Sequence, residues 1–271
     1  MVKSPISQWK MNDNAADTTV ADAVGSNVGT LAGGDNTEDI STTGKINRAL
    51  DFDGASDVVS IPNASSLNPT EITITMWVKF NEIPYSGQIG LNKEGQYRFI
   101  AGDVDSSHLS IRYATTTTGW TDGKLAGNTV LTSGVWYYAV ATYDGSSWKL
   151  YLNGNLDGQT AESGTILSKT PLLYIGSHNA GPTGHYFNGM IDDVRIYNFS
   201  LSYAEQLAIF NHGRGTEDEN PFAFPGPPYK TLSGTIQEVL NKLQGENLKA
   251  GNLLFFSVTA GNARAQFCRM K

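Results

Sequence analysis

The chain has 271 residues and a formal net charge of −7, and charged residues make up 17% of it, against about 25% in a typical soluble protein. A chain of this length can close a core without disulfides or a structural metal, and its single cysteine, Cys268, has no partner within the chain. The acidic charge argues against a nucleic-acid partner, and no window approaches the roughly 18 consecutive apolar residues that cross a bilayer.

The N-terminal residues show no secretory signal. They read MVKSPISQWKMND and lack both an apolar stretch and a cleavage site with small residues. A signal peptide was therefore either removed or never present. We expect no membrane insertion and no nucleic-acid binding.

Short strands separated by turns are expected between residues 49 and 197. In residues 72–80 apolar and polar residues alternate, which predicts one core face. The turn sequences Asp144-Gly145 and Asn153-Gly154 are typical of tight hairpins with positive φ angles. The expected strands are residues 49–54, 57–62, 72–80, 96–101, 109–114, 135–143, 148–152, 172–176 and 190–197. Strands at this spacing, without long helices between them, predict a mainly β, two-sheet antiparallel sandwich.

A short helix and a linker are expected after the last strand. Ser202 and Glu205 form a capping box, and Gly213 is the expected end of the helix. Residues 214–229 contain four prolines and three consecutive acidic residues, which predict an extended linker. We therefore expect a first domain over residues 1–213.

Residues 230–271 predict a small C-terminal region. Thr235 and Glu238 form a second capping box before a helix with one apolar stripe, and residues 252–259 and 263–270 predict a β-hairpin. Its apolar residues are Ile236, Val239, Leu240 and Leu243 in the helix, and Phe255 and Phe256 in the hairpin. About forty residues bury such a surface poorly, so we expect assembly through these residues. A homo-oligomer is expected, with a trimer favoured over a dimer, or capture by a larger shell.

Nine short motifs follow one another through residues 1–213. They are WKM at 9–11, the run from Ala21 to Leu31, ALDFDG at 49–54, ITMWV at 74–78, GVW at 134–136, TYDG at 142–145, LYLNG at 150–154, YIG at 174–176 and GMIDDVRIYN at 189–198. In this order they resemble the laminin G-like, concanavalin A-like jelly-roll family. The resemblance implies a two-sheet jelly roll whose first and last strands pair, a calcium ion in many cases, and recognition of glycans or proteins.

Calcium is thus the expected cofactor, and it requires six to eight oxygen ligands. The loop that begins at Asp22 offers that carboxylate and Asn27. If the first and last strands are neighbours, as the resemblance implies, Asp192 or Asp193 lies close enough to contribute. We expect a structural Ca²⁺ site of Asp22, Asn27 and Asp192. The alternative is an Asx-turn loop, with Asp192 solvated and Asp193 paired with Arg195.

Catalytic motifs are not found in the sequence. A glycanase of this superfamily would carry paired carboxylates on one strand, spaced so that both face the sugar, and no strand here has that pattern. The sequence also lacks a Gly-x-Ser-x-Gly elbow and a phosphate-binding loop, and its four histidines do not have zinc-site spacing. The sequence therefore predicts a protein that is not an enzyme.

Aromatic residues in loops are the candidates for sugar binding, because aromatic rings stack on the apolar faces of pyranoses. Trp120 lies in a loop rich in Thr and Gly. The other candidates are Tyr113, Tyr85 and Tyr186. The alternative for each is a place in the sandwich core, as expected for Trp77, Trp136 and Trp148.

Two functions follow from these features. The first is a recognition or adhesion module that binds a glycan or a cell-surface polymer and is displayed through the C-terminal region. The alternative is a structural virion protein, a phage capsid decoration or fibre subunit, in which the jelly roll is the display domain. Both place the protein outside the cell or on a virion surface.

Overall fold

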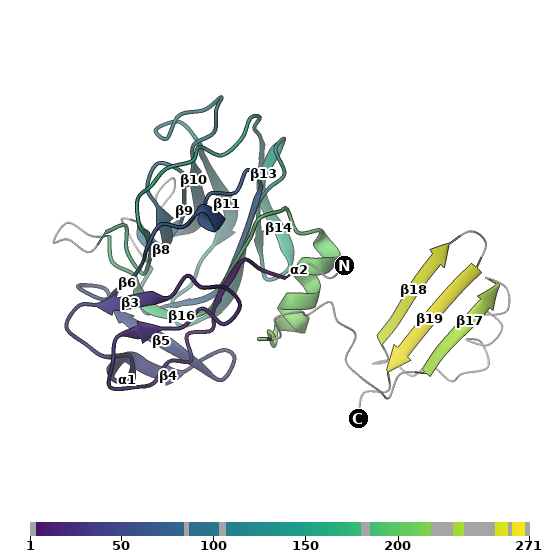
Figure 1. The fold of residues 1–271 in the computed structure, drawn as a ribbon, viewed down its shortest axis with the longest axis horizontal. Coiled ribbons are helices and arrows are strands. Elements are labelled where there is room, and N and C mark those ends of the chain that lie inside the picture. The colour runs from purple at the N-terminus through teal and green to yellow at the C-terminus, as the bar shows by residue number, and fades with distance from the viewer. Residues whose placement is uncertain are drawn as a thin grey trace. The chain divides into compact units, whose positions relative to one another are not determined.

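A computed structural model describes residues 4–83, 87–102, 107–179, 185–217, 230–235, 253–259 and 262–268. Its contacts divide the chain into two compact units, Met1–Phe222 and Ala223–Lys271, each described by itself. Within the described residues, the first unit contains two eight-stranded sheets that pack face to face (Figure 1). The predicted mainly β, two-sheet antiparallel jelly roll is confirmed.

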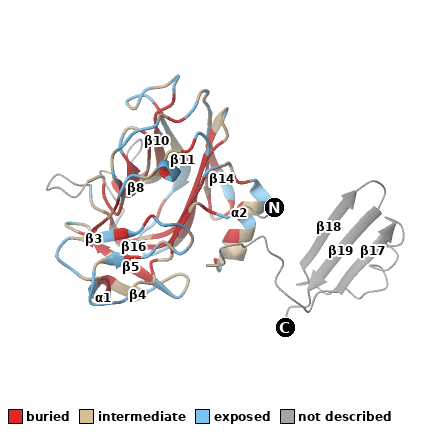
Figure 2. Ribbon diagram, in the orientation of Figure 1, coloured by how far each residue is buried: buried red, intermediate tan, exposed pale blue. Residues whose placement is uncertain are grey.

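Sheet A has the strand order β14-β13-β12-β7-β16-β5-β4, with β1 also paired to β16. Its strands are β1 (Ser7–Trp9), β4 (Ser41–Thr43), β5 (Arg48–Asp53), β7 (Ile72–Phe80), β12 (Trp136–Tyr143), β13 (Ser147–Leu152), β14 (Asn155–Ala161) and β16 (Asn188–Tyr197). The first and last strands of the unit are neighbours, with Ser7 opposite Ile196. Strand β16 is buried along most of its length (Figure 2).

Sheet B has the order β11-β10-β9-β8-β15-β6-β3-β2. Its strands are β2 (Thr19–Val20), β3 (Gly29–Ala32), β6 (Val58–Ile61), β8 (Gln88–Lys93), β9 (Tyr97–Ala101), β10 (His108–Tyr113), β11 (Lys124–Val130) and β15 (Leu173–Ile175). One face of this sheet packs on the core. We call the opposite face the outer face of sheet B.

The main core lies between the sheets, and a second apolar cluster lies on the outer face of sheet A. On β7, Ile74 and Met76 belong to the main core, whereas Trp77 belongs to the second cluster. Helix α2 (Tyr203–Phe210) covers this cluster, and the Phe210 ring stacks on Trp77 with 5.8 Å between centroids. The sequence predicted one buried face for this strand, but α2 buries the other as well. The remaining helical segments of the unit are α1 (Thr37–Ile40), η1 (Ser65–Leu67) and η2 (Asn211–Gly213).

The ends of α2 follow from its sequence. Ser202 accepts a hydrogen bond from the Glu205 amide, and the Glu205 carboxylate accepts one from the Ser202 amide. This is the predicted capping box. The helix ends at Asn211, whose left-handed φ of 47° stops it before Gly213.

Strand β8 is not among the strands expected from the sequence. Three of its six residues are polar. Gln88, Asn92 and Lys93 are nevertheless buried. The Lys93 ammonium donates to Asn63 Oδ1 at 2.6 Å and to the Pro171 carbonyl at 3.0 Å. These partners are distant in sequence, so a local pattern does not indicate them.

The chain leaves the sandwich beside its N-terminal strand. Arg195 is fully buried, pairs with Asp193 at 2.9 Å, and donates to the Thr216 carbonyl. Asn12 Nδ2 donates to Glu217 Oε1 at 2.8 Å. Residues 214–217, which the sequence places in the linker, are therefore held on the sandwich. Residues 218–229 lie outside the described residues.

The second unit contains a sheet in the order β17-β19-β18, formed by β17 (Lys230–Thr235), β18 (Leu253–Thr259) and β19 (Asn262–Cys268). The antiparallel pairing of β18 with β19, where Thr259 lies opposite Asn262, corresponds to the expected hairpin. Strand β17 was not predicted; it ends at Thr235, the expected helix cap. Phe255 and Phe256 lie in β18. The stripe Ile236, Val239, Leu240 and Leu243 lies outside the described residues. None of the helices in the described parts of the chain is long and apolar enough to span a membrane.

Candidate functional site

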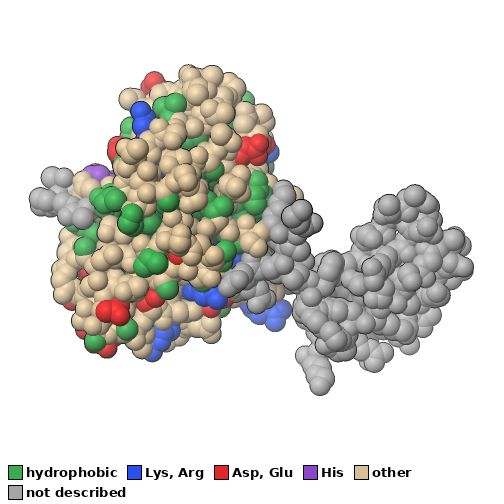
Figure 3. Space-filling view, in the orientation of Figure 1, with side chains coloured by type: hydrophobic (Ala, Val, Ile, Leu, Met, Phe, Trp, Pro, Cys, Tyr) green, Lys and Arg blue, Asp and Glu red, His purple; other side chains and the backbone are tan. Residues whose placement is uncertain are grey.

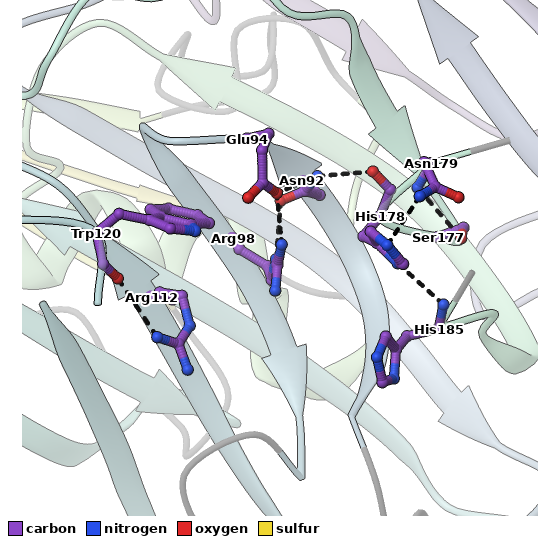
Figure 4. A network of polar contacts seen from close by, with 9 residues as sticks. All are labelled: Asn92, Glu94, Arg98, Arg112, Trp120, Ser177, His178, Asn179 and His185. Carbon is purple, nitrogen blue, oxygen red and sulfur yellow. Dashed lines mark hydrogen bonds and ion pairs between the residues drawn. The ribbon is translucent and has the colours of Figure 1, made fainter. Parts of the chain in front are cut away.

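The indole of Trp120 lies on the outer face of sheet B, in the loop between β10 and β11. It covers the guanidinium group of Arg98, with 5.1 Å from Arg98 Cζ to the ring centroid (Figure 4). Arg98 lies on β9 between Tyr97 and Phe99, both buried in the main core. Since side chains alternate along a strand, Arg98 points away from the core and toward Trp120.

Arg98 is held from β8 and the turn that follows it. Its Nε donates to Asn92 Oδ1 at 2.9 Å, and its Nη2 pairs with Glu94 Oε2 at 2.5 Å. Asn92 is fully buried, and its Nδ2 donates to the His178 carbonyl at 2.9 Å. The guanidinium group therefore has a fixed position beneath the indole (Figure 4).

The loop that carries Trp120 is itself braced. Glu162 Oε1 accepts hydrogen bonds from Thr115 Oγ1 at 3.0 Å and Thr117 Oγ1 at 2.7 Å. Partial burial raises the pKa of Glu162, but the hydrogen bonds from these threonines outweigh it and hold the pKa below its usual value. Arg112 Nη1 also donates to the Trp120 carbonyl at 3.3 Å. The aromatic ring is thus positioned in advance of any ligand.

Two histidines lie next to this group. The rings of His178 and His185 have centroids 5.3 Å apart, and His178 Nδ1 accepts a hydrogen bond from the His185 amide at 3.0 Å. Burial, the Arg98 charge and His185 lower the pKa of His178. The two imidazoles thus lie together beside Arg98 (Figure 4).

The site lies within a row of polar side chains that crosses sheet B from edge to edge. Each member is directly opposite the next on the neighbouring strand, so all lie on the same face. From β11 to β2 the row is Lys124, Arg112, Arg98, Asn92, Tyr174, Ser60, Thr30 and Thr19. Positively charged side chains are therefore adjacent at the end of the row nearest Trp120.

The other aromatic candidates have different positions. Tyr113 is only 4% exposed and stacks on Trp148 with 5.0 Å between centroids, so it belongs to the core and its assignment to the binding surface is corrected. Tyr113 is the third of three alternate residues of β10, after Leu109 and Ile111, that all point into the main core. Tyr186 is half-buried beside His185. Tyr85 lies outside the described residues.

Two of the expected calcium ligands, Asp22 and Asn27, form hydrogen bonds within the protein. Asp22 Oδ1 accepts from the Gln8, Val24 and Gly25 amides, and Oδ2 accepts from the Asn27 amide at 3.0 Å. This is an Asx-turn that also fastens the loop to β1. The side chain of Asn27 is also bonded within the protein, because its Nδ2 donates to Ser7 Oγ at 2.7 Å and to Ser66 Oγ at 3.2 Å.

Asp192 is held by another loop. It is fully buried, where the alternative interpretation had it solvated, and its Oδ2 accepts from the Ile46 amide at 2.8 Å. Burial raises the pKa of Asp192 to about 8, which favours its neutral form when no cation is bound. The described residues contain no group of three or more His, Cys, Asp or Glu side chains arranged to hold a metal. Such groups do not include asparagine, so the calcium site of Asp22, Asn27 and Asp192 stays a prediction.

Comparison with known proteins identifies the fold. A family model described as the concanavalin A-like lectin/glucanases superfamily matches residues 53–205. No curated protein matches the chain. Domain 4 of AbnA, an extracellular GH43 arabinanase from Geobacillus stearothermophilus solved with arabinotriose, is similar over 80% of this chain and 100% of its own, with 16% identity and a TM-score of 0.58.

Two further solved structures are similar. Trypanosoma rangeli sialidase, in complex with the inhibitor DANA, matches with 16% identity and a TM-score of 0.53 over 78% of this chain and 34% of its own. The binding domain of Paraclostridial Mosquitocidal Protein 1 matches with 13% identity and a TM-score of 0.59, over 96% and 65% respectively. The present chain thus spans about a third of the sialidase chain.

These neighbours contradict the prediction that the chain is not an enzyme. The fold occurs within an arabinanase and within a sialidase. The prediction relied on missing strand and loop motifs, and such a search cannot separate an enzyme's accessory domain from a protein without enzymatic function. The fold alone is therefore shown, and it is compatible with a place in an enzyme.

Proposed function

Because the chain belongs to the concanavalin A-like lectin/glucanase superfamily, we propose that its first unit is a carbohydrate-binding domain that uses the outer face of sheet B around Trp120. The observation that carries the proposal is the indole held over Arg98. Domain 4 of AbnA, solved with arabinotriose, and the binding domain of the mosquitocidal protein support it. The ligand would be a glycan or cell-surface polymer, encountered outside the cell or on a virion surface.

The arrangement has the two parts that sugar recognition needs. An aromatic ring provides a flat apolar surface, and fixed polar groups around it bond to hydroxyl groups. One side of the Trp120 ring lies on Arg98, and because the side chain is only half-buried, part of the indole remains accessible. Glu94 and the histidine pair provide polar groups beside Arg98 (Figure 4).

Most of one face of the first unit is uncharged. In the view of Figure 3, uncharged polar side chains and backbone form most of the surface of the first unit, and charged side chains are isolated. The exposed aromatic ring of Tyr203, 52% exposed, lies on α2 at the other sheet. It therefore offers a matched control for an aromatic substitution.

The test is binding of the full chain to a panel of neutral and acidic polysaccharides, measured by affinity electrophoresis and calorimetry. Trp120→Ala should weaken binding by about 1–3 kcal/mol and leave the melting temperature nearly unchanged. Tyr203→Ala should leave binding intact. Equal effects of the two substitutions, or no binding to any polysaccharide, would refute the proposal.

A further inference from the structure

We propose that Tyr174 is a second sugar-stacking residue of this face, and that the ligand is a linear polysaccharide that binds in an extended conformation across the strands of sheet B. This inference rests on the proposed function and adds the class of polymer and a further residue that recognises it. Its basis is the position of Tyr174 in the row of polar side chains, two strands away from Arg98 and the indole that covers it.

The register places Tyr174 on the outer face of sheet B. It lies on β15 between Leu173 and Ile175, which both belong to the main core. Since side chains alternate along a strand, Tyr174 points to the opposite face, as Arg98 does on β9. Its two neighbours are fully buried, whereas Tyr174 is only half-buried, so part of the side chain remains accessible.

Asn92 lies between the two aromatic positions. It is opposite Arg98 on one side and opposite Tyr174 on the other. Neighbouring strands are about 4.8 Å apart, so roughly 10 Å separates the backbone of Arg98 from that of Tyr174. This separation is comparable with the length of two sugar residues in an extended chain. A chain that stacks one sugar on Trp120, above Arg98, can therefore place the next sugar but one on Tyr174.

A fixed acceptor lies beside Asn92, where the intervening sugar would pass. Glu94 Oε2 is 3.5 Å from Asn92 Nδ2 and pairs with Arg98 at 2.5 Å. About half of the Glu94 side chain is nevertheless exposed. An ionised carboxylate has lone pairs for several hydrogen bonds, so Glu94 can accept from sugar hydroxyl groups without leaving Arg98.

The row stays open beyond Tyr174. Its next members are Ser60, Thr30 and Thr19, each directly opposite the one before, and β2 with Thr19 is the edge of the sheet. Ser60 is half-buried, and the two threonines are exposed. Short hydroxyl side chains thus continue the row to the edge, and no bulky member of the row ends the path. Such an open path is typical of binding within a chain, whereas recognition of a chain end requires a closed pocket.

The experiment compares short and long oligosaccharides of linear polymers with the full chain. The probes are the disaccharides and hexasaccharides of cellulose, xylan, linear arabinan and polygalacturonate, and calorimetry measures their affinities. A hexasaccharide spans both rings, whereas a disaccharide reaches only one. The hexasaccharide that binds should therefore do so at least about tenfold more tightly than its disaccharide.

Three variants separate the second ring from the larger number of ways in which a longer chain can bind. Tyr174→Thr removes the ring and introduces a residue suited to a strand. It should weaken hexasaccharide binding about fivefold and leave disaccharide binding unchanged. Tyr174→Phe keeps the ring and should bind as the wild type does. Tyr151→Thr removes a half-buried tyrosine from β13 in sheet A and should change neither affinity.

The outcomes distinguish this inference from the proposed function. Equal affinities of the two lengths in the wild type would overturn the inference whether or not Tyr174→Thr folds, and so would a gain with length that persists in a folded Tyr174→Thr. A polysaccharide of the panel that binds at Trp120 while none of the four hexasaccharides binds would also overturn it, and would leave the proposed function standing. Binding to no polysaccharide would overturn both.

Discussion

Trp120 and Arg98 form a stacked pair on the outer face of sheet B, with 5.1 Å from Arg98 Cζ to the indole centroid. The pair joins a loop residue to a strand residue, and Arg98 is in turn bonded to Asn92 and Glu94. The position of the aromatic ring therefore depends on strands β8 and β9 as much as on its own loop.

Arg98→Lys tests this dependence. Lysine keeps the positive charge but loses the planar group that stacks on the ring and the Nε–H that reaches Asn92. We expect polysaccharide binding to weaken by about 1 kcal/mol, because an exposed cation–π contact contributes about 0.5–1 kcal/mol. Calorimetry measures the affinity. Subtracting the emission spectrum of the Arg98→Lys, Trp120→Phe double variant from that of Arg98→Lys isolates the emission of Trp120. We expect this emission to indicate a more solvated indole than in the wild type. Unchanged affinity and emission would contradict a positioning role.

Asp22→Ala tests the calcium expectation. The Asp22 carboxylate accepts hydrogen bonds from four backbone amides, so its loss should destabilise the protein by about 1–3 kcal/mol. Because these bonds need no metal, their loss should lower the melting temperature in calcium and in chelator alike, and a calcium ion held by Asp22 would add a further decrease in calcium only. A wild-type protein that calcium stabilises, beside a variant that it does not, would support a calcium site.

Asp192→Asn tests the consequence of burying a carboxyl group. Burial raises the pKa of Asp192 to about 8, against about 3.9 in an unfolded chain. Between these pH values the carboxyl group is protonated in the folded state and ionised in the unfolded state. Its contribution to the free energy of unfolding is therefore fully present below about pH 3.9 and is lost as the pH rises toward 8.

Asparagine stays neutral at every pH, so the variant should be more stable than the wild type at pH 8, by several kcal/mol at about 1.4 kcal/mol per pKa unit. The difference should vanish near pH 4. Thermal melting at both pH values measures it. A difference that does not depend on pH would show that Asp192 keeps its ordinary pKa.

Sedimentation of the full chain and of residues 1–217 tests the predicted assembly. We expect the full chain to be a homo-oligomer, with a trimer favoured, and the fragment to be a monomer. The fragment ends after Glu217 because Thr216 and Glu217 are bonded to the sandwich. A monomeric full chain at micromolar concentration would contradict the assembly role of Phe255, Phe256 and the apolar stripe.

The fold could be predicted where local chemistry determines structure. Asn153 and Gly154 have φ angles of 51° and 79°, as their turn signal predicts, and Ser202 caps α2 as expected. Strand β8 could not be predicted, because its buried polar residues, such as Lys93, depend on hydrogen-bond partners that only folding brings close. Local patterns identify turns and caps, whereas burial of a polar strand is a tertiary property.

The same distinction applies to the site. Trp120 was found because an aromatic residue in a polar loop is unusual. Arg98 and Asn92 were missed because each lies in a strand, where nothing in the sequence marks an outward polar residue as functional. The pairing of His178 with His185 could not be predicted, because their approach depends on how the loop after β15 folds.

The described part of the first unit begins and ends at one place. Ile6 donates its amide hydrogen to the Ile196 carbonyl at 2.8 Å, and Gln8 Nε2 donates to the Glu217 carbonyl at 3.4 Å. A domain whose ends are adjacent can be inserted into a loop of another protein without forcing that loop apart. A short peptide that joins residue 217 to residue 4, with new ends opened at the exposed Ser146 in the turn between β12 and β13, should give a circular permutant that retains the sandwich. The jelly roll is thus suited to insertion as a complete domain into a loop of another protein.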